Sequence, residues 1–345
     1  MQVFKKILAV FIGFIVAVLG WVVGTDYDPE NIEHLIASGE NKNMLAAEEP
    51  LRISIFNIGY GGLDASQDFF MDGGSGSKSL SLKQTQKNIE GVIDYLEMSS
   101  ADIAVLQEVD IDSKRSYEVN EYDMIISALS KYNDVSTLYY KVPFVPVPFN
   151  APMGKVEMSL LTLSKSQISK GTRYKLPNES KIPDKFFLLD RCIMESIHPL
   201  DNGKNLVVLN IHLSAYDSKG TVKKEQLRWI ENYIESADLE NNYYVFGGDW
   251  NLVMTDTSGE DKSSQRAYWI EKPKDFKAGG FEWYYDEKVN TVRELDAPYQ
   301  NGKTFERVID GYLVSPNVEV LAVETVDLGF ENSDHNPVLL DIKLK

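Results

Sequence analysis

The sequence predicts an α+β protein built from two stacked β-sheets. Short apolar runs rich in β-favouring residues recur along most of the chain, and such runs are typical of buried strands. Only two stretches beyond residue 50 show apolar positions at helical spacing, and they lie far apart. Many strands with few, separated helices favour two packed sheets. The chain has 345 residues, 43% of them hydrophobic, which is enough for one large domain or two small ones.

The N-terminus is expected to form a membrane anchor. Lys5 and Lys6 precede an uncharged apolar stretch, Ile7–Val23. Its length is near the lower limit of roughly 17–25 residues for crossing a bilayer, and it exceeds the about 7–15 residues of a signal-peptide core. We therefore predict an uncleaved transmembrane helix within residues 1–24, with a cleaved signal peptide as the alternative.

The charges on either side of this stretch predict the orientation of the chain. Two lysines precede it, whereas Asp26, Asp28 and Glu30 follow it. Basic residues favour the cytoplasmic side, so we expect the rest of a single-pass cell-membrane protein to lie outside the cytoplasm. Cleavage near Val22 would make the protein a secreted one. Residues 25–50 are polar and mixed, and we expect them to form a linker.

The folded domain is expected from residue 51 onward, and its elements follow in order. The strands are predicted at residues 52–58, 102–109, 159–164, 191–197, 205–213, 243–247, 307–314, 318–326 and 338–344. A helix is predicted from Ser81, which forms a capping box with Gln84, to about Glu97. A second helix fits residues 222–236. Residues 252–300 are irregular.

Two segments with special composition lie between these elements. Residues 59–79 are rich in glycine, and a loop of this length inside a domain is usually functional or disordered. Residues 139–152 contain four prolines, which excludes an interior strand. Aromatic residues in 68–71 and 143–149 allow two interpretations. They form an apolar rim that contacts lipid, or they pack beneath their own loops.

Polar side chains follow five of the apolar runs, at the points where the strands are expected to end. In chain order, these side chains and the pair that follows them near the C-terminus are Asn57, Glu108, His212, Asp249 with Asn251, Asp310, and Asp334 with His335. Residues at the rim of a sheet carry function on a rigid scaffold. Carboxylates, amides and histidines together suit a hard divalent cation, a water to be activated and an anionic substrate.

Each of these residues taken alone also has an ordinary structural explanation. Glu108 fits a salt-bridged glutamate at a strand end, and Asn57 before a glycine fits a turn residue. Gly247 and Gly248 fit a bulge or a tight turn. A lone histidine such as His212 is more often structural than catalytic. The functional interpretation therefore depends on the whole ordered set.

In their order, these motifs resemble the endonuclease/exonuclease/phosphatase superfamily, which includes DNase I, abasic-site endonucleases, inositol-polyphosphate phosphatases and bacterial sphingomyelinases. The matching positions are Asn57, Gln107-Glu108, His212, Gly248-Asp249-Trp250-Asn251, Asp310 and Ser333-Asp334-His335. The resemblance spans about residues 51–345, which we therefore expect to be the catalytic domain. It implies a four-layer αββα sandwich with the site at one end.

The resemblance also implies a metal site. Glu108 is expected to ligate the metal, and Asn57 to lie beside it as a ligand through oxygen or as a hydrogen-bond donor. Asp334 is expected to ligate the metal or to position water. An all-oxygen set of this kind suits Mg²⁺, with Mn²⁺ as the alternative.

The resemblance assigns the remaining residues to catalysis. Asp249 orients or deprotonates the attacking water, and Asn251 holds the phosphate and the nucleophile. His335 binds the phosphoryl oxygen while Asp310 supports its imidazole. His212 contacts the phosphate or the leaving group, at the position where the sphingomyelinase-like branch carries histidine.

The charge of the chain bears on its partners. The formal net charge is −17, which argues against nucleic acid as the main partner, because nucleic-acid binding needs a basic surface. We therefore expect a monomeric, Mg²⁺-dependent phosphoesterase of the sphingomyelinase-like kind. Its expected partners are a phosphorylated small molecule or lipid head group, and a membrane through the N-terminal helix. The alternatives are a DNase I-like extracellular endonuclease and a non-catalytic binding domain on the same fold.

Five further residues invite an interpretation from the sequence. Arg115, Arg191 and Lys155 are candidate phosphate contacts, or else ordinary surface charges. Cys192 is the only cysteine, so no intrachain disulfide forms, and its apolar run predicts a buried structural thiol. His198 has no motif around it and is expected in solvent or in a loop.

Overall fold

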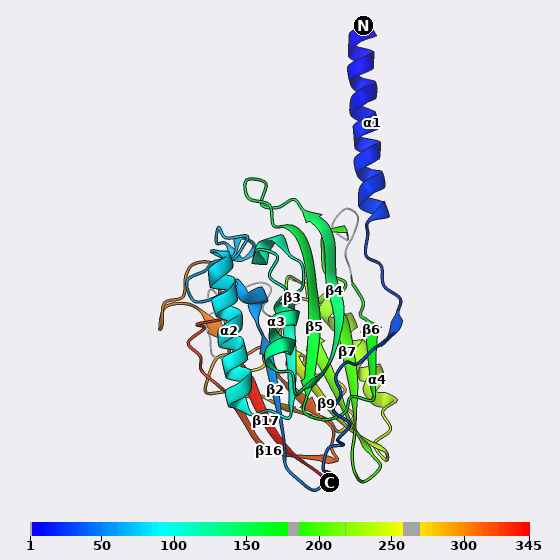
Figure 1. The fold of residues 1–345 in the computed structure, drawn as a ribbon, viewed down its shortest axis with the longest axis vertical. Helices are drawn as coiled ribbons and strands as arrows, with labels where there is room; N and C mark the ends of the chain where they lie inside the picture. Colours follow the sequence, from blue (N-terminus) through cyan, green and yellow to red (C-terminus); the bar gives the residue numbers. More distant parts are fainter. Residues whose placement is uncertain (1, 179–185, 218, 258–269) are drawn as a thin grey trace.

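The computed structural model describes residues 2–178, 186–217, 219–257 and 270–345 (Figure 1), and these contain two large mixed β-sheets. The seven-stranded sheet has the order β1 (Ile32–Leu35), β6 (Lys170–Lys175), β7 (Cys192–Pro199), β8 (Asn205–His212), β9 (Asn242–Asp249), β15 (Asp310–Val314), β12 (Glu282–Tyr284). The six-stranded sheet has the order β16 (Val318–Thr325), β17 (Val338–Leu344), β2 (Leu51–Asn57), β3 (Ile103–Asp110), β5 (Gly154–Ser164), β4 (Asn133–Val145). The pairs β8–β9 and β2–β3 are parallel, and the other pairs in these sheets are antiparallel.

The two sheets stack on each other and bury the main core between them. Side chains of alternate residues meet there, with Ile53 and Ile55 of β2 in the same cluster as Val208 of β8 and Val245 of β9. All four are at most 1% exposed. The predicted α+β sandwich of two sheets is therefore confirmed.

Three helices cover the outer faces of the sheets. Helices α2 (Leu82–Ser99) and α3 (Glu121–Ala128) pack on the six-stranded sheet, and α4 (Thr221–Glu235) packs on the seven-stranded sheet. The capping prediction for α2 is confirmed, since Ser81 Oγ accepts a hydrogen bond from the Gln84 backbone N–H at 3.1 Å. Apolar residues at helical spacing thus face a sheet in each of the two predicted helices.

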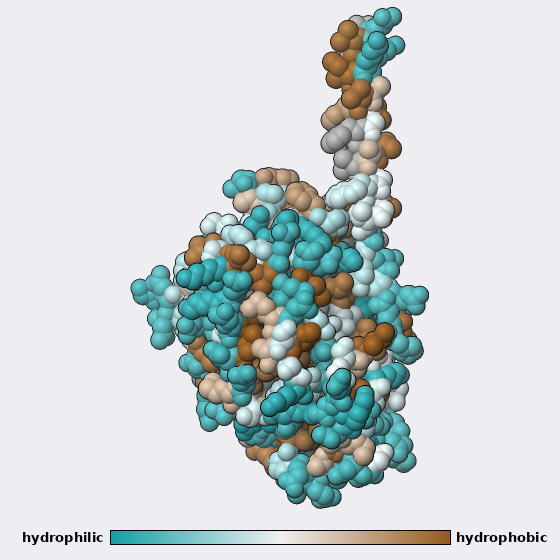
Figure 2. All heavy atoms as spheres, viewed as in Figure 1, coloured by the Kyte–Doolittle hydropathy of each residue, from teal (hydrophilic) through white to brown (hydrophobic). Residues whose placement is uncertain are grey.

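The N-terminal residues form a separate helix, α1 (Gln2–Gly24), which projects from the body of the molecule (Figure 1). Apolar side chains cover much of its surface (Figure 2). In the part of the chain that the structure describes, no helix is long and apolar enough to cross a membrane, so the predicted transmembrane span is not confirmed. The location of the protein stays a prediction.

The segment 25–50 differs from the expected linker. Strand β1 pairs with β6 at the edge of the seven-stranded sheet, and Leu45 is 6% exposed in the core between the sheets. The apolar residues of this segment are too few to signal a strand. Ile32 of β1 is 56% exposed, so β1 is held by backbone pairing at the sheet edge, whereas Leu45 fills a gap in the core.

The short elements complete the described fold. They are the 3₁₀ turns η1 (Gly59–Gly61), η2 (Phe70–Asp72) and η3 (Lys114–Ser116), and the strand pairs β10 (Leu252–Val253) with β11 (Ile270–Glu271) and β13 (Val292–Arg293) with β14 (Glu306–Arg307). Sequence patterns missed α3, β4 and β6. They also missed the short strands β10, β11, β12 and β13 within residues 252–300, which were predicted to be irregular and of which 258–269 lie outside the described residues. Strand β4 contains Pro143, and it lies at the edge of its sheet, where a proline removes no ladder hydrogen bond. The predicted strand 307–314 is divided between β14 and β15.

Candidate active site

The predicted site residues meet at one end of the two sheets because of the strand directions. Strands β2 and β3 are parallel, as are β8 and β9, so Asn57, Glu108, His212 and Asp249 lie at or near the ends of strands that finish at the same edge. Strand β15 runs antiparallel to β9, so its first residue, Asp310, pairs directly with Asp249. Parallel neighbours therefore contribute their last residues to the site, and the antiparallel strand contributes its first.

Local backbone irregularities aim two of these side chains. Glu108 has a φ of 59° and lies where the register between β3 and β5 shifts. Asn251 has a φ of 51°. Non-glycine residues in this region are strained by about 1–3 kcal/mol and cluster at functional sites. The bulge carries Glu108 out of the alternation of its strand and into the site.

Gly247 and Gly248 allow the close approach that the sequence suggested. A Cβ at Gly247 would lie 2.9 Å from Ile55 Cγ2 in the opposite sheet. A Cβ at Gly248, whose φ is 144°, would collide with the backbone carbonyl of Ile211. Only glycines therefore let β9 deliver Asp249 to this place.

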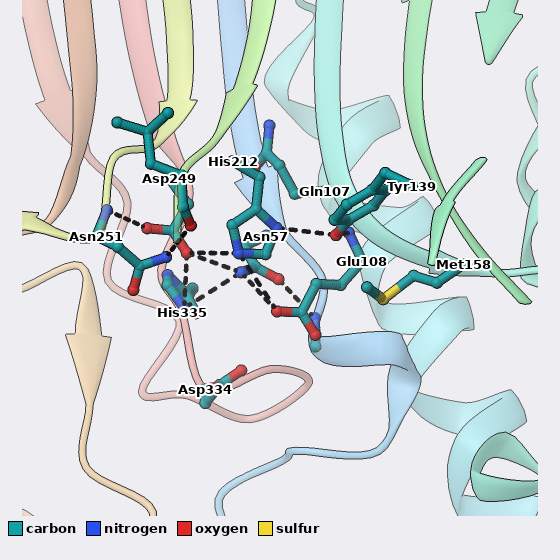
Figure 3. A network of polar contacts seen from close by, with 12 residues as sticks. Asn57, Gln107, Glu108, Tyr139, Met158, His212, Asp249, Asn251, Asp334 and His335 are labelled. Atoms are coloured by element: carbon teal, nitrogen blue, oxygen red, sulfur yellow. Dashed lines mark hydrogen bonds and ion pairs between the residues drawn. The ribbon is translucent and has the colours of Figure 1, made fainter. Parts of the chain in front are cut away.

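Asn57 connects the two halves of the site (Figure 3). Its Nδ2 lies 3.2 Å from Glu108 Oε1, 3.1 Å from Asp249 Oδ2 and 3.4 Å from His335 Nε2. Its Oδ1 accepts the backbone N–H of Gly59 at 3.1 Å. As it lies here, Asn57 is a donor to the carboxylates, which is the second of the two roles expected for it.

His335 is paired with Asp310. Its Nδ1 lies 2.9 Å from Asp310 Oδ2, and the Asp310 backbone N–H donates to Thr291 Oγ1 at 3.1 Å. Burial alone would lower the pKa of His335, but the carboxylates of Asp310 and Asp334 raise it to about 10. With Nδ1–H held by Asp310, the Nε2–H of this imidazolium points at the site, 3.8 Å from Asp249 Oδ2.

His212, unlike His335, is held in the neutral state. The Tyr139 hydroxyl accepts the Glu108 backbone N–H at 3.2 Å and lies 2.8 Å from His212 Nδ1. The phenol keeps its proton because burial raises its pKa well above the ordinary value, so it donates to Nδ1. Burial, then Arg191 and His335, lower the pKa of His212 well below its usual range. His212 is therefore neutral, with its proton on Nε2, 3.4 Å from Asp249 Oδ2.

Asp249 lies between the two histidines. Burial and the neighbouring Asp310 raise its pKa to about 7, and its Oδ1 accepts the Asn251 backbone N–H at 2.8 Å. Asn251 is held in turn by Lys223, whose Nζ donates to its carbonyl at 2.8 Å. A carboxylate with a pKa near neutrality is suited to general-base chemistry.

The residues that sequence reasoning missed are Tyr139, Lys223 and Thr291. Lys223 had a signal, because it lies one helical turn before Leu227 on the apolar face of α4. A lysine at such a position, 2% exposed here, needs a buried partner. Tyr139 and Thr291 had no signal in the sequence, since their contacts come from residues distant along the chain.

Glu108 and Asp334 best fit a bound cation. Burial raises the pKa of Glu108, and the Asp334 carboxyl raises it further. Burial also raises the pKa of Asp334. Two buried carboxyl groups that disfavour each other's charge are stabilised when a divalent cation binds them, so the donor set fits the Mg²⁺ that the sequence predicted.

A second group of acids and histidine is more compact. Among the described residues, Asp249, Asp310 and His335 offer ligand atoms within 4.8 Å of one another. We assign this group to proton transfer, because His335 already binds Asp310 through Nδ1 and an imidazolium does not ligate a metal.

A cavity of about 490 Å³ opens onto the site. The predicted phosphate contacts differ in how they relate to it. Arg191 lines it beside His212, whose carbonyl its Nη1 approaches to 3.4 Å. Arg115 also lines it, but its guanidinium is bound by Asp110 at 2.9 Å and lies 3.7 Å above the Tyr60 ring. Lys155 pairs instead with Asp112 and Glu157. Arg191 is thus the cation best placed for an anionic substrate.

Cys192 and His198 lie in β7, and neither lines the cavity. Cys192 is buried, and burial raises its thiol pKa to about 11, so the predicted structural thiol is confirmed. His198 is 0% exposed and contacts Ser196 Oγ at 2.9 Å, so the prediction of a solvent or loop position is wrong. The strand alternation that buries it could not be seen in a run containing Pro199.

The family of the chain follows from comparison with known proteins. Residues 57–335 match the model of the Endonuclease/Exonuclease/phosphatase family. The chain belongs to this family. The match begins and ends on two residues of the site described above. Members of the family are generally hydrolases of phosphoester bonds that use a divalent metal. No curated protein sequence matches the chain.

Solved structures of the family share the fold. A Beutenbergia cavernae endonuclease/exonuclease/phosphatase is 18% identical, with a TM-score of 0.55, over 86% of this chain and 72% of that one. D. rerio TDP2 complexed with a single-strand DNA product is 16% identical, with a TM-score of 0.51, over 86% and 99%. ANGEL2, a 2′,3′-cyclic phosphatase, is 13% identical, with a TM-score of 0.55, over 91% and 99%. At these identities the likeness concerns the fold alone.

Proposed function

We propose that this family member is a Mg²⁺-dependent hydrolase of phosphoester bonds in a phosphorylated small molecule or lipid head group. The observation that carries the proposal is the position of Asp249 between two histidines, one cationic and one neutral. Its Oδ2 is 3.8 Å from His335 Nε2 and 3.4 Å from His212 Nε2. A base and two donors converge where a phosphoryl group would be attacked.

The residues then divide the reaction between them. Asp249 accepts the proton of the attacking water, because its pKa of about 7 leaves it able to act as a base near neutrality. His335 donates Nε2–H to a phosphoryl oxygen and stabilises the charge that develops there. The neutral His212 donates its Nε2–H to a second oxygen of the phosphate.

Glu108 and Asp334 would hold the cation, and Asn57 orients Glu108. A divalent cation bound there would supply polarisation of the phosphoryl oxygen and charge stabilisation for the leaving group. Arg191 attracts the anionic group into the cavity.

The test is a panel of substrates with the full chain. Bis-p-nitrophenyl phosphate, sphingomyelin, phosphoinositides and plasmid DNA are each assayed with Mg²⁺, Mn²⁺ and EDTA. We expect hydrolysis of a small or lipid phosphoester with Mg²⁺ and none in EDTA. Full activity in EDTA contradicts the metal site. Nicking of plasmid DNA without turnover of any other substrate favours the nuclease alternative, and no turnover of any substrate favours the non-catalytic one.

A further inference from the structure

The cavity at the site is lined by two chemically different groups of side chains. Glu108, Asp249 and His335 belong to its polar lining. The apolar lining belongs to, or packs against, one core cluster, and we call it the apolar wall. Its members come from the loop after β2, the β4–β5 hairpin, the segment before β7 and the end of β13, and they are Leu63, Phe69, Phe70, Val145, Val147, Met153, Met158, Phe187, Leu189 and Leu295.

The apolar wall is packed and therefore preformed. Leu63, Phe69, Val145, Met153 and Leu295 are each at most 8% exposed and belong to one cluster. The Phe69 and Phe70 rings meet edge to face at 4.9 Å. The Phe69 backbone N–H donates to the Leu295 carbonyl at 2.8 Å, which ties the loop after β2 to the far side of the cavity. Of the two interpretations of the 68–71 aromatics, packing beneath the loop is thus the one observed for Phe69.

The mouth of the cavity is apolar as well. Met71, Leu188 and Tyr216 line the cavity and are 43%, 39% and 47% exposed. Close to the wall, the β4–β5 hairpin carries Phe144 and Phe149, which are 42% and 89% exposed. Apolar contact area therefore continues from the catalytic residues to the protein surface.

The cavity offers little to a long polyanion. Of the arginines that line it, Arg115 is bound by Asp110. Arg293 donates to the carbonyls of Leu63 and Asp64 at 3.1 and 2.7 Å. Arg191 remains for one phosphate. A volume of about 490 Å³ lies within the roughly 300–1,000 Å³ of sites that enclose a small molecule.

We propose that the apolar wall binds the hydrocarbon chain of an amphiphilic phosphoester while its phosphate lies among Asp249, His335 and Arg191. The occupant follows from continuity, because one cavity joins the wall to the residues that act on phosphorus. This inference rests on the proposed function and narrows its substrate class. The hydrocarbon of the ligand is buried against a preformed wall, and the ester bond then lies beside the polar lining of the cavity.

A ligand series tests binding apart from catalysis. Titration calorimetry of the full chain with n-alkyl phosphonates of two to twelve carbons, in Mg²⁺ and below their micelle concentrations, measures Kd against chain length. We expect Kd to fall roughly three- to fourfold for each methylene until the wall is filled, from the usual gain per buried methylene. A Kd that does not change with chain length overturns the proposal.

A matched series of p-nitrophenyl alkyl phosphodiesters tests the same wall during turnover. We expect kcat/KM to rise with chain length by a similar factor per methylene. Hydrolysis with no dependence on chain length contradicts the apolar wall and leaves the proposed function standing. Chain-length-dependent binding of phosphonates without hydrolysis of any ester contradicts the proposed function instead.

Substitutions in the cavity test which side chains cause the dependence of kcat/KM on alkyl length. Met153→Gln places an amide in the wall at similar size, and it should reduce the ratio of octyl to methyl kcat/KM by at least tenfold. Leu188→Ser removes an exposed apolar contact at the mouth, and it should reduce the ratio about threefold. Leu321→Ser in β16 is the matched control, since Leu321 is 49% exposed and does not line the cavity. If the Met153→Gln protein unfolds below the assay temperature, the Leu188→Ser protein provides the test instead. Equal octyl-to-methyl ratios of kcat/KM for Leu188→Ser and Leu321→Ser overturn the proposal.

Discussion

His335 and His212 lie in one site, are about equally buried, and carry different charges. They are 4% and 3% exposed. The pKa of His335 is raised to about 10, whereas that of His212 is well below the ordinary value. Burial lowers the pKa of both imidazoles, but the carboxylates of Asp310 and Asp334 raise that of His335, whereas Arg191 and His335 lower that of His212 further. The neighbouring charges thus decide which of the two buried histidines is a cation.

This comparison explains how one site can hold a base and two different donors. In the proposed reaction, a cationic His335 stabilises negative charge on the phosphoryl group, and a neutral His212 donates without adding a second positive charge beside it. His335 itself contributes to the lowered pKa of His212. The neutral state of His212 therefore depends in part on the charge of His335.

The largest effect is expected when the positive charge of His335 is removed. His335→Gln keeps a side chain of similar reach but loses the positive charge, so kcat should fall about 10²- to 10³-fold, as for loss of a donor to a developing anion. The measurement is kcat on a p-nitrophenyl phosphodiester with saturating Mg²⁺. A loss under threefold contradicts the assigned role, provided that circular dichroism shows the variant folded.

Removal of the carboxylate that makes His335 a cation should have a smaller effect, and one that depends on pH. In Asp310→Asn, the pKa of His335 falls from about 10, so the imidazole loses its proton as pH rises through the neutral range. We expect a roughly 10- to 100-fold loss of kcat at pH 8 and a smaller loss at pH 6. Nitrogen-15 chemical shifts of the imidazole report the charge directly. A loss of equal size at both pH values would mean that Asp310 acts only on position.

A third histidine shows what burial does without a carboxylate. His198 has a pKa lowered to about 3 by burial alone. Because the unfolded chain binds this proton below about pH 6.5 and the folded chain does not, stability falls as pH drops from 6.5 toward 3. Between pH 7 and pH 5 this histidine should cost about 2 kcal/mol of unfolding free energy.

Urea unfolding of the wild type and of His198→Gln at the two pH values measures that cost. The variant should lose about 2 kcal/mol less than the wild type between pH 7 and pH 5. The difference between the two pH values is the readout, so any constant effect of the substitution cancels. Parallel losses in the two proteins would falsify the buried neutral state of His198.

The smallest expected effect concerns the neutral partner. Tyr139→Phe removes the hydroxyl that accepts from the Glu108 backbone N–H and donates to His212 Nδ1. We expect a loss of about 1–2 kcal/mol in stability, because a buried donor loses its acceptor. We also expect a loss of up to about tenfold in kcat, since the His212 tautomer is no longer held. Tyr243→Phe is the matched control, because the buried Tyr243 hydroxyl donates to the Lys345 carbonyl and Tyr243 does not line the cavity.

Much of the fold could be predicted because its signals are local. The runs that form β2, β3, β8, β9 and β17 were recognised by composition alone, and the α2 cap by two side chains three residues apart. Strand β1 and the core position of Leu45 could not be recognised, since they depend on a sheet edge and a gap formed by residues far along the chain. Helix α3 is only eight residues long, too short to show a helical repeat of apolar positions.

The sequence by itself determined which residue types stand at the ends of the strands, and in what order, because strand patterns and short motifs are properties of neighbouring residues. Only the tertiary structure decided that Asp310, 25 positions from His335, helps to make it a cation, and that Tyr139, 73 positions from His212, contacts its Nδ1. It also decided that a wall of apolar side chains from four separate segments lies beside the catalytic acids. Charge state and cavity shape depend on distances in space of a few ångströms, and a linear pattern does not contain those distances.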